Sequence, residues 1–119
     1  MDYRAHRKLD VWKKSMDFVK HVYQATETFP KSEIYGLISQ MRRAAVSIPS
    51  NVSEGAARQS SKEFLQFLYI AQGSAAELET QLIISKELGL CNKEKGNELL
   101  GHLEDISRMI IGLQKSLRR

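Results

Sequence analysis

Residues 99–117 read LLGHLEDISRMIIGLQKSL, and the spacing of their apolar side chains predicts one long amphipathic helix. The apolar positions recur at alternating steps of three and four residues, at Leu99, Leu103, Ile106, Ile110, Leu113 and Leu117. Such steps line up one stripe along a helix, and helices with this kind of stripe pack against neighbours at a shallow angle.

Three further segments carry stripes of the same spacing. These are Leu9, Trp12, Met16, Val19 and Tyr23; Ile34, Ile38, Met41, Ala45, Ile48 and Val52; and Phe64, Leu68, Ala71, Ala75, Leu78 and Leu82. Four stripes predict an all-α chain with long helices at about 10–28, 32–57, 61–88 and 93–117. The short connections between them make each helix antiparallel to the one before. We therefore expect a single domain over 1–119, an up-down-up-down four-helix bundle.

Polar residues at the ends of the stripes predict where the helices begin and end. Asp10, Ser32, Ser60 and Asn92 are candidate N-caps, and Gly89 is a candidate left-handed C-cap. Glu63 stands three residues after Ser60, as in a capping box.

Pro49 lies inside the second predicted helix and removes one backbone donor there. This predicts a kink near Pro49, and the alternative is a break followed by a short extra helix. The stripe continues in phase from Ile48 to Val52, which favours the kink.

Composition excludes several classes of protein. The chain has 119 residues and one cysteine, so it cannot form an internal disulfide and fits a reducing compartment. Its longest runs without a charged residue, 44–53 and 64–76, are too short to span a bilayer. We expect a cytoplasmic protein that has no signal peptide and does not bind membranes.

The sequence offers no recognisable catalytic or metal motif. Neither His6, His21 nor His102 has a glutamate three residues before it, as a di-iron bundle requires, and we interpret all three as surface or helix-flank residues. Cys91 is a lone thiol, and no Gly-x-Ser-x-Gly turn or phosphate-binding glycine loop is present. We expect no enzyme activity, no cofactor and no small-molecule substrate.

The stretch 44–57 is rich in small side chains, and 71–76 in the third predicted helix is similar. It forms either a tightly packed helix within one bundle or a self-association surface, and the two interpretations are compatible. Candidate residues for oligomer or helix packing are Ala44, Ser47, Ser50, Asn51, Ser53, Glu54, Gly55, Gly73, Ser74 and Glu77.

The segment 42–55, RRAAVSIPSNVSEG, resembles the signature of the 23S rRNA intervening-sequence proteins, a bacterial family of four-helix bundles. Further matches are Leu9 with Val11-Trp12, Phe29-Pro30, the run 33–37 and the run 73–79, so the resemblance spans about 9–113. Val52-Ser53 departs from the family, which usually has Ile-Ala there.

The resemblance implies a fold, an assembly and a kind of ligand. Some family members are encoded within insertions in 23S rRNA genes, and many have no assigned activity. The family is similar in fold to the accessory protein of diversity-generating retroelements, a basic homopentamer that binds nucleic acid and a reverse transcriptase. By that similarity, this chain should form a homopentamer, and no catalytic residues carry over.

The net charge of +4 permits nucleic-acid binding without requiring it. Candidate phosphate-binding residues are Arg4, Arg7, Lys8, Lys13, Lys14, Arg42, Arg43, Arg58, Lys62, Arg118 and Arg119. Arg42 and Arg43 have an alternative role, pairing with Glu54, Glu77 or Glu79.

Tyr3 and Trp12 are candidates for stacking on bases, although Trp12 lies on an apolar stripe and is better interpreted as packing. The first functional hypothesis is therefore an oligomeric RNA- or DNA-binding protein. The alternative is a protein-interaction or scaffold subunit, for example a reverse-transcriptase accessory protein, with no nucleic-acid role.

Overall fold

The structure is a computed structural model that describes residues 4–119. Four α-helices make up most of it: α1 (Asp10–Thr26), α2 (Ser39–Ala56), α3 (Ser61–Glu87) and α4 (Lys93–Leu117). A short 3-10 helix, η1 (Ala5–Lys8), precedes α1. Two short helical elements precede α2: the 3-10 helix η2 (Lys31–Glu33) and the π-helix η3 (Ile34–Ile38). No helix among the described residues is long and apolar enough to cross a membrane.

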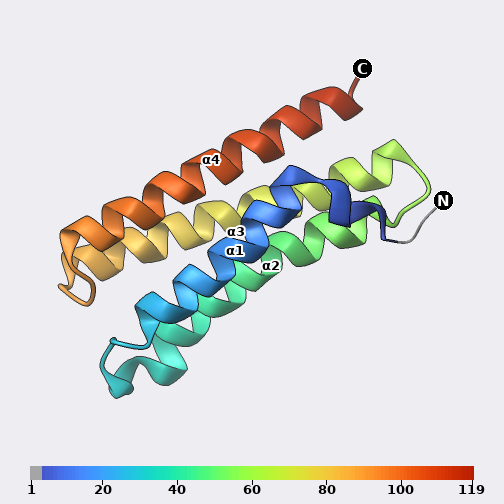
Figure 1. The fold of residues 1–119 in the computed structure, drawn as a ribbon. Coiled ribbons are helices and arrows are strands. Elements are labelled where there is room, and N and C mark those ends of the chain that lie inside the picture. Colours follow the sequence, from blue (N-terminus) through green and yellow to red (C-terminus); the bar gives the residue numbers. More distant parts are fainter. Residues whose placement is uncertain (1–3) are drawn as a thin grey trace.

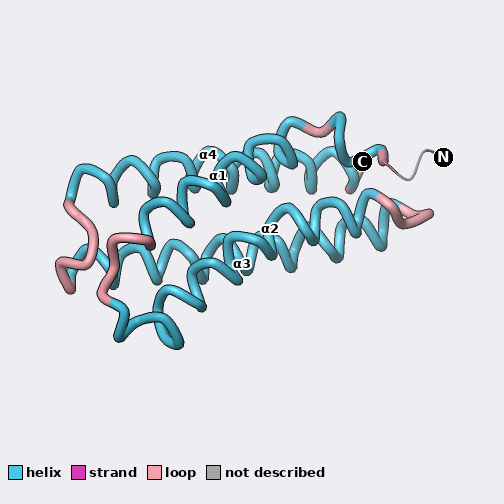
Figure 2. Tube along the Cα trace, turned by 60° about the horizontal axis from the view of Figure 1, so that its bottom comes forward, coloured by secondary structure: helices cyan, strands magenta, loops and turns pink. Residues whose placement is uncertain are grey.

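The four helices form an elongated bundle of 45 × 21 × 19 Å. They lie in two layers, with α1 beside α4 and α2 beside α3 (Figure 2). Each short turn reverses the chain, so the described start of the chain, the α2–α3 turn and the C-terminus all lie at one end of the bundle (Figure 1). The all-α, antiparallel four-helix architecture expected from the stripes is confirmed.

Most of the predicted helix ends are confirmed. Ser60 Oγ accepts a hydrogen bond from Glu63 N at 3.2 Å, and Asn92 Oδ1 accepts one from Lys95 N at 2.7 Å. Gly89 adopts φ 71°, the left-handed conformation that glycine accepts at a helix C-terminus.

Two predicted N-caps are wrong. The residue before α1 is Leu9, and Asp10 is already the first helical residue, with no side-chain cap. Ser32 lies within η2, and the regular α-helix begins only at Ser39. Glu33 instead accepts a hydrogen bond from Leu37 N at 3.4 Å, and the backbone leaves helical geometry at Gly36.

α2 continues as one helix through Pro49. The alternative of a break with a separate short helix after Pro49 is therefore wrong. A bend of the helix axis at this proline stays a prediction.

The core is built from the predicted stripes of α2, α3 and α4, except that Ile34, predicted to begin the second stripe, lies in η3 and is 46% exposed. Buried residues include Ile48 in α2, Leu78 in α3 and Ile106 in α4, each fully shielded from solvent. The stripe predicted for α1 is only partly correct: Leu9, Trp12 and Val19 are partly buried and pack against the core, whereas Met16 and Tyr23 are each 40% exposed. The buried residues of α1 instead follow the line Val11, Ser15, Phe18, Val22, Ala25 and Thr26. The predicted stripe is therefore a second apolar line on the side of α1.

α2 and α3 make the most extensive helix contact in the bundle. It is close at Gly55, where an added Cβ would lie 2.8 Å from Phe67 Cβ and 2.9 Å from Phe64 Cδ1. A glycine here lets the two backbones approach with aromatic rings packed between them.

Gly55→Ala should lower the free energy of unfolding by about 1–3 kcal/mol, because the methyl group overpacks the contact. Gly101→Ala in α4 is the matched control, since no atom lies within 4 Å of its added Cβ. That control should be neutral or stabilising by up to about 1 kcal/mol. Urea denaturation at one protein concentration measures the free energy of unfolding of both variants. Equal changes in the two variants would contradict the close contact at Gly55.

Candidate nucleic-acid interface

Three segments that are far apart in the sequence lie at one end of the bundle (Figure 1). We define this basic end as residues 4–13, 54–63 and 112–119. Its lysines and arginines are Arg4, Arg7, Lys8, Lys13, Arg58, Lys62, Lys115, Arg118 and Arg119. Only three carboxylates accompany these nine cations, so the basic end carries +6 in a chain whose total charge is +4. The rest of the molecule is close to neutral.

Two guanidinium groups of the basic end are held by neighbours. Arg58 Nη2 lies 3.4 Å from Glu54 Oε1, and its guanidinium lies 4.8 Å from the centre of the Phe67 ring. Arg118 Nη1 donates to Tyr69 Oη at 2.9 Å, which ties the C-terminus of α4 to α3. Exposed contacts of this kind orient a side chain and contribute little to stability. Both groups remain accessible to a phosphate.

Four further cations of the basic end point into solvent. Arg7, Lys8, Lys13 and Lys62 are exposed, and none makes an ion pair with another residue in the range 4–119. The charge of these four is therefore not neutralised by another residue that the structure describes. A polyanion that approaches this end meets an uncompensated positive surface.

Three of the predicted phosphate-binding residues lie elsewhere. Lys14 Nζ contacts Asp105 Oδ2 at 3.3 Å across the α1–α4 boundary. Arg42 donates to Thr26 Oγ1 at 2.9 Å and to the Tyr23 carbonyl at 3.2 Å. The Arg42 guanidinium also lies 4.4 Å from the centre of the Tyr23 ring.

The expected pairing of Arg42 with Glu54, Glu77 or Glu79 is therefore wrong. Its partners lie at the C-terminus of α1, where the Tyr23 carbonyl also accepts from Glu27 N at 3.1 Å. Arg43 is exposed on α2, toward the other end of the bundle.

The small-residue stretch is divided between the inside and the surface. Ser47 Oγ lies 2.8 Å from Ser74 Oγ, and Asn51 Nδ2 donates to the Ser47 carbonyl at 2.8 Å. With buried Ala44 and Gly55, these residues form the contact of α2 with α3. Other members of the set lie at least partly at the surface, and they are Ser50, Ser53, Glu54, Gly73 and Glu77.

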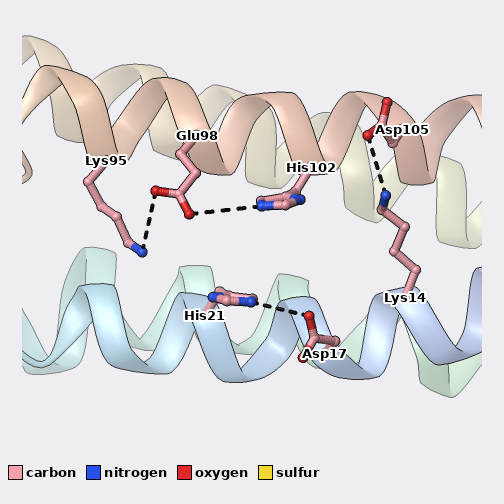
Figure 3. A network of polar contacts seen from close by, with 7 residues as sticks. All are labelled: Lys14, Asp17, His21, Lys95, Glu98, His102 and Asp105. Atoms are coloured by element: carbon pink, nitrogen blue, oxygen red, sulfur yellow. Dashed lines mark hydrogen bonds and ion pairs between the residues drawn. The ribbon is translucent and has the colours of Figure 1, made fainter.

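Two histidines that the sequence analysis gave no role meet across α1 and α4. The rings of His21 and His102 stack with their centres 5.7 Å apart and their planes 12° apart. His21 Nε2 lies 3.2 Å from Asp17 Oδ2, and His102 Nε2 lies 4.0 Å from Glu98 Oε1 (Figure 3).

The sequence spacing of these histidines and carboxylates contained a signal for the polar contacts between α1 and α4. Each histidine follows a carboxylate by four residues, so each pair shares one side of its own helix. The sequence does not say that the two helices bring these sides together. Within residues 4–119, no group of three or more His, Cys, Asp and Glu side chains is arranged to hold a metal ion.

A family model for the 23S rRNA-intervening sequence protein matches residues 7–112. The chain belongs to this family. The matched range includes most of the basic end, from Arg7 to Lys62, and stops before Lys115, Arg118 and Arg119. Membership in the intervening-sequence family confirms the resemblance drawn from residues 42–55.

A solved structure supports the fold of this intervening-sequence protein. It is a protein of unknown function from the S23 ribosomal protein family of Bacteroides thetaiotaomicron. The two chains are 23% identical and superpose with a TM-score of 0.80, over 88% of this chain and 98% of the other. At that identity the likeness shows the fold alone. A comparison with curated proteins finds no match.

Cys91 lies in the α3–α4 turn, where its surroundings shift the pKa of its thiol. Partial burial raises the pKa of its thiol above the ordinary value, and the charge of Lys86 opposes this effect only in part. A thiol with a raised pKa holds less thiolate at neutral pH and reacts slowly.

Alkylation of Cys91 by iodoacetamide should therefore reach its half-maximal rate at a higher pH than that of free cysteine. Lys86→Gln should move the midpoint higher still, because it removes the charge that favours the thiolate. Lys93→Gln is the control for a general loss of charge. The adduct is counted by intact mass, since the chain has one cysteine. A midpoint at or below that of free cysteine would contradict the burial argument.

Proposed function

We propose that this intervening-sequence protein is a non-enzymatic, oligomeric, cytoplasmic protein that binds RNA or DNA through its basic end. The single observation that carries the proposal is the charge of +6 gathered there from three separate segments. Lysine and arginine side chains meet phosphates directly, and binding releases the counterions condensed on the nucleic acid. The sequence of the nucleic acid contributes little to such contacts.

Oligomerisation would strengthen this interaction. By resemblance the assembly is a homopentamer, in which five chains of +4 carry +20. The outer side of α3 supports self-association because it exposes apolar side chains, among them Tyr69, Ile70 and Ile84 at 45%, 51% and 40%. Gly73 lies on α3 with open space where a Cβ would stand, so another backbone can approach there. Light scattering on the purified protein measures the number of chains, and a monomer would overturn this part of the proposal.

A second candidate function, a protein-interaction subunit, is favoured by the opposite end of the bundle. A groove of about 600 Å³ opens there, lined partly by Tyr23, Ile34 and Arg43. Tyr35 in its wall is 97% exposed, so its ring is not buried by the rest of this chain. Retention of a defined partner after nuclease treatment, and its loss in Tyr35→Ser, would favour this function.

The nucleic-acid proposal predicts a steep dependence of affinity on salt. Binding to a fluorescently labelled structured RNA should weaken severalfold or more between about 50 and about 200 mM salt. The double variant Arg7→Gln/Lys8→Gln should weaken binding and reduce the slope of log K against log salt by about 2 if both side chains contact phosphates.

Lys93→Gln/Lys95→Gln, at the opposite end of the bundle, is the matched control for the loss of two charges. Fluorescence anisotropy measures the RNA affinity of the unmodified protein and of the two double variants at each salt concentration. An affinity that is flat with salt, or equal losses in the two double variants, would exclude the basic end as the binding surface.

A further inference from the structure

A groove of about 380 Å³ opens between α1 and α2 beside the basic end. Its walls include Trp12 and Met16 from α1, Val46 and Pro49 from α2, and His6 from η1. We call it the α1–α2 groove. Its volume lies in the range of small-ligand sites, roughly 300–1,000 Å³.

The apolar wall on α1 lies at the edge of the core, because Trp12 and Val19 are partly buried and pack against it while Met16 is exposed. It belongs to the second apolar line of the helix, whereas the buried line runs through Phe18 and Val22. Met16 is 40% exposed and Val46 is 39% exposed, so both walls of the groove leave apolar surface in water. Apolar surface of this kind beside a strongly charged region is typical of a binding site.

Trp12 gives the groove an aromatic surface of fixed orientation. Its ring meets the His6 ring edge-on, with centres 5.1 Å apart and planes at 67°. The contact holds η1 against the start of α1. The indole is half-buried, so part of its surface stays accessible in the groove.

Cations border the groove on the α1 side. Lys13 lies three residues before Met16, and Lys20 lies four residues after it. Each lysine is therefore a neighbour of Met16 on the surface of α1. Arg7 and Lys8 extend this border on η1, directly after His6. A ligand that fits must combine a flat apolar part with negative charge.

On the α2 side, the groove offers hydroxyl groups. Ser53 Oγ donates to the Ser50 carbonyl at 2.9 Å, and its lone pairs remain able to accept. Ser50 is exposed on the same wall. Such hydroxyls can bond to the polar edge of a planar group that lies against Trp12.

We propose that the α1–α2 groove binds an unpaired nucleobase of single-stranded RNA or DNA, which stacks on Trp12 while Arg7, Lys8 and Lys13 hold the neighbouring phosphates. The inference rests on the proposed function and names its substrate class. Every base has a π-face, so stacking on an aromatic side chain combined with basic contacts suits single strands of any sequence. Bases inside a duplex are stacked on one another and do not reach such a groove.

The chain's single tryptophan makes the stacking measurable. Titration with a single-stranded oligouridylate or oligothymidylate should quench Trp12 emission, and an RNA duplex of equal length should bind without quenching. Trp12→Leu should lower single-strand affinity by about tenfold, followed by anisotropy, while leaving duplex affinity unchanged. A thermal melt by circular dichroism checks that this variant is folded.

A second pair of variants leaves Trp12 in place. Ser50→Glu puts a carboxylate on the groove wall, and Gln40→Glu makes the same change of charge on another exposed position of α2. Single-strand binding should fall severalfold more in Ser50→Glu than in Gln40→Glu, with equal effects on duplex binding.

The outcomes separate the two proposals. Equal binding of single strand and duplex with no quenching overturns the groove inference and leaves phosphate binding at the basic end standing. Absence of binding to any nucleic acid overturns both. Shielding of Trp12 from acrylamide in the assembled free protein would show that a second copy fills the groove, and would also overturn the inference.

Discussion

The antiparallel order of the helices is the constraint from which the rest of this structure follows. The turns after α2 and α3 are a few residues long and reverse the chain, and the longer α1–α2 connection reverses it as well. Four helices therefore bring the described start of the chain, the C-terminus and the α2–α3 turn to one end of the bundle. The cations near residues 7, 62 and 118 therefore lie at the same end of the bundle although they are far apart in the sequence. Like charges repel, and the apolar core of the bundle must hold them together. The excess of cations contributes nothing to folding.

The sequence predicted the stripes of α3 and α4 and most of that of α2, and its partial error on α1 has a simple physical cause. The buried line of that helix contains Ser15 and Thr26, which look unsuitable for a core. Ser15 Oγ donates to the Val11 carbonyl at 2.6 Å, and Thr26 Oγ1 donates to the Val22 carbonyl at 2.8 Å. A hydroxyl bonded to the carbonyl four residues earlier carries its partner with it, so it can be buried at little cost. The apolar line 9, 12, 16, 19 and 23 then looked like the better core.

The candidate site was only partly readable from the sequence. The cations of the basic end were identifiable singly, and the helix order implied by short turns was enough to bring them together. The engagement of Arg42 by Tyr23 and Thr26 was not readable, because it depends on where α1 ends and on the late start of α2 at Ser39. The stacking of His21 on His102 depends in the same way on the relative rotation of two helices. A periodic pattern predicts the inward side of each helix only approximately, and it does not say which flanking side chains of two helices meet.

The two layers of the bundle are joined internally by different kinds of contact, and this difference bears on function. α2 and α3 pack through glycine, alanine and serine, with Ser47 bonded to Ser74. α1 and α4 share a seam of charged and imidazole side chains, including the Lys14–Asp105 pair. Exposed ion pairs stabilise weakly, whereas close backbone packing excludes water and resists separation. α1 also carries a second apolar line, exposed at Met16 and Tyr23, and lysines beside it. A surface that combines these properties is suited to contacts outside its own chain, and it begins at the end of the bundle where the positive charge is gathered.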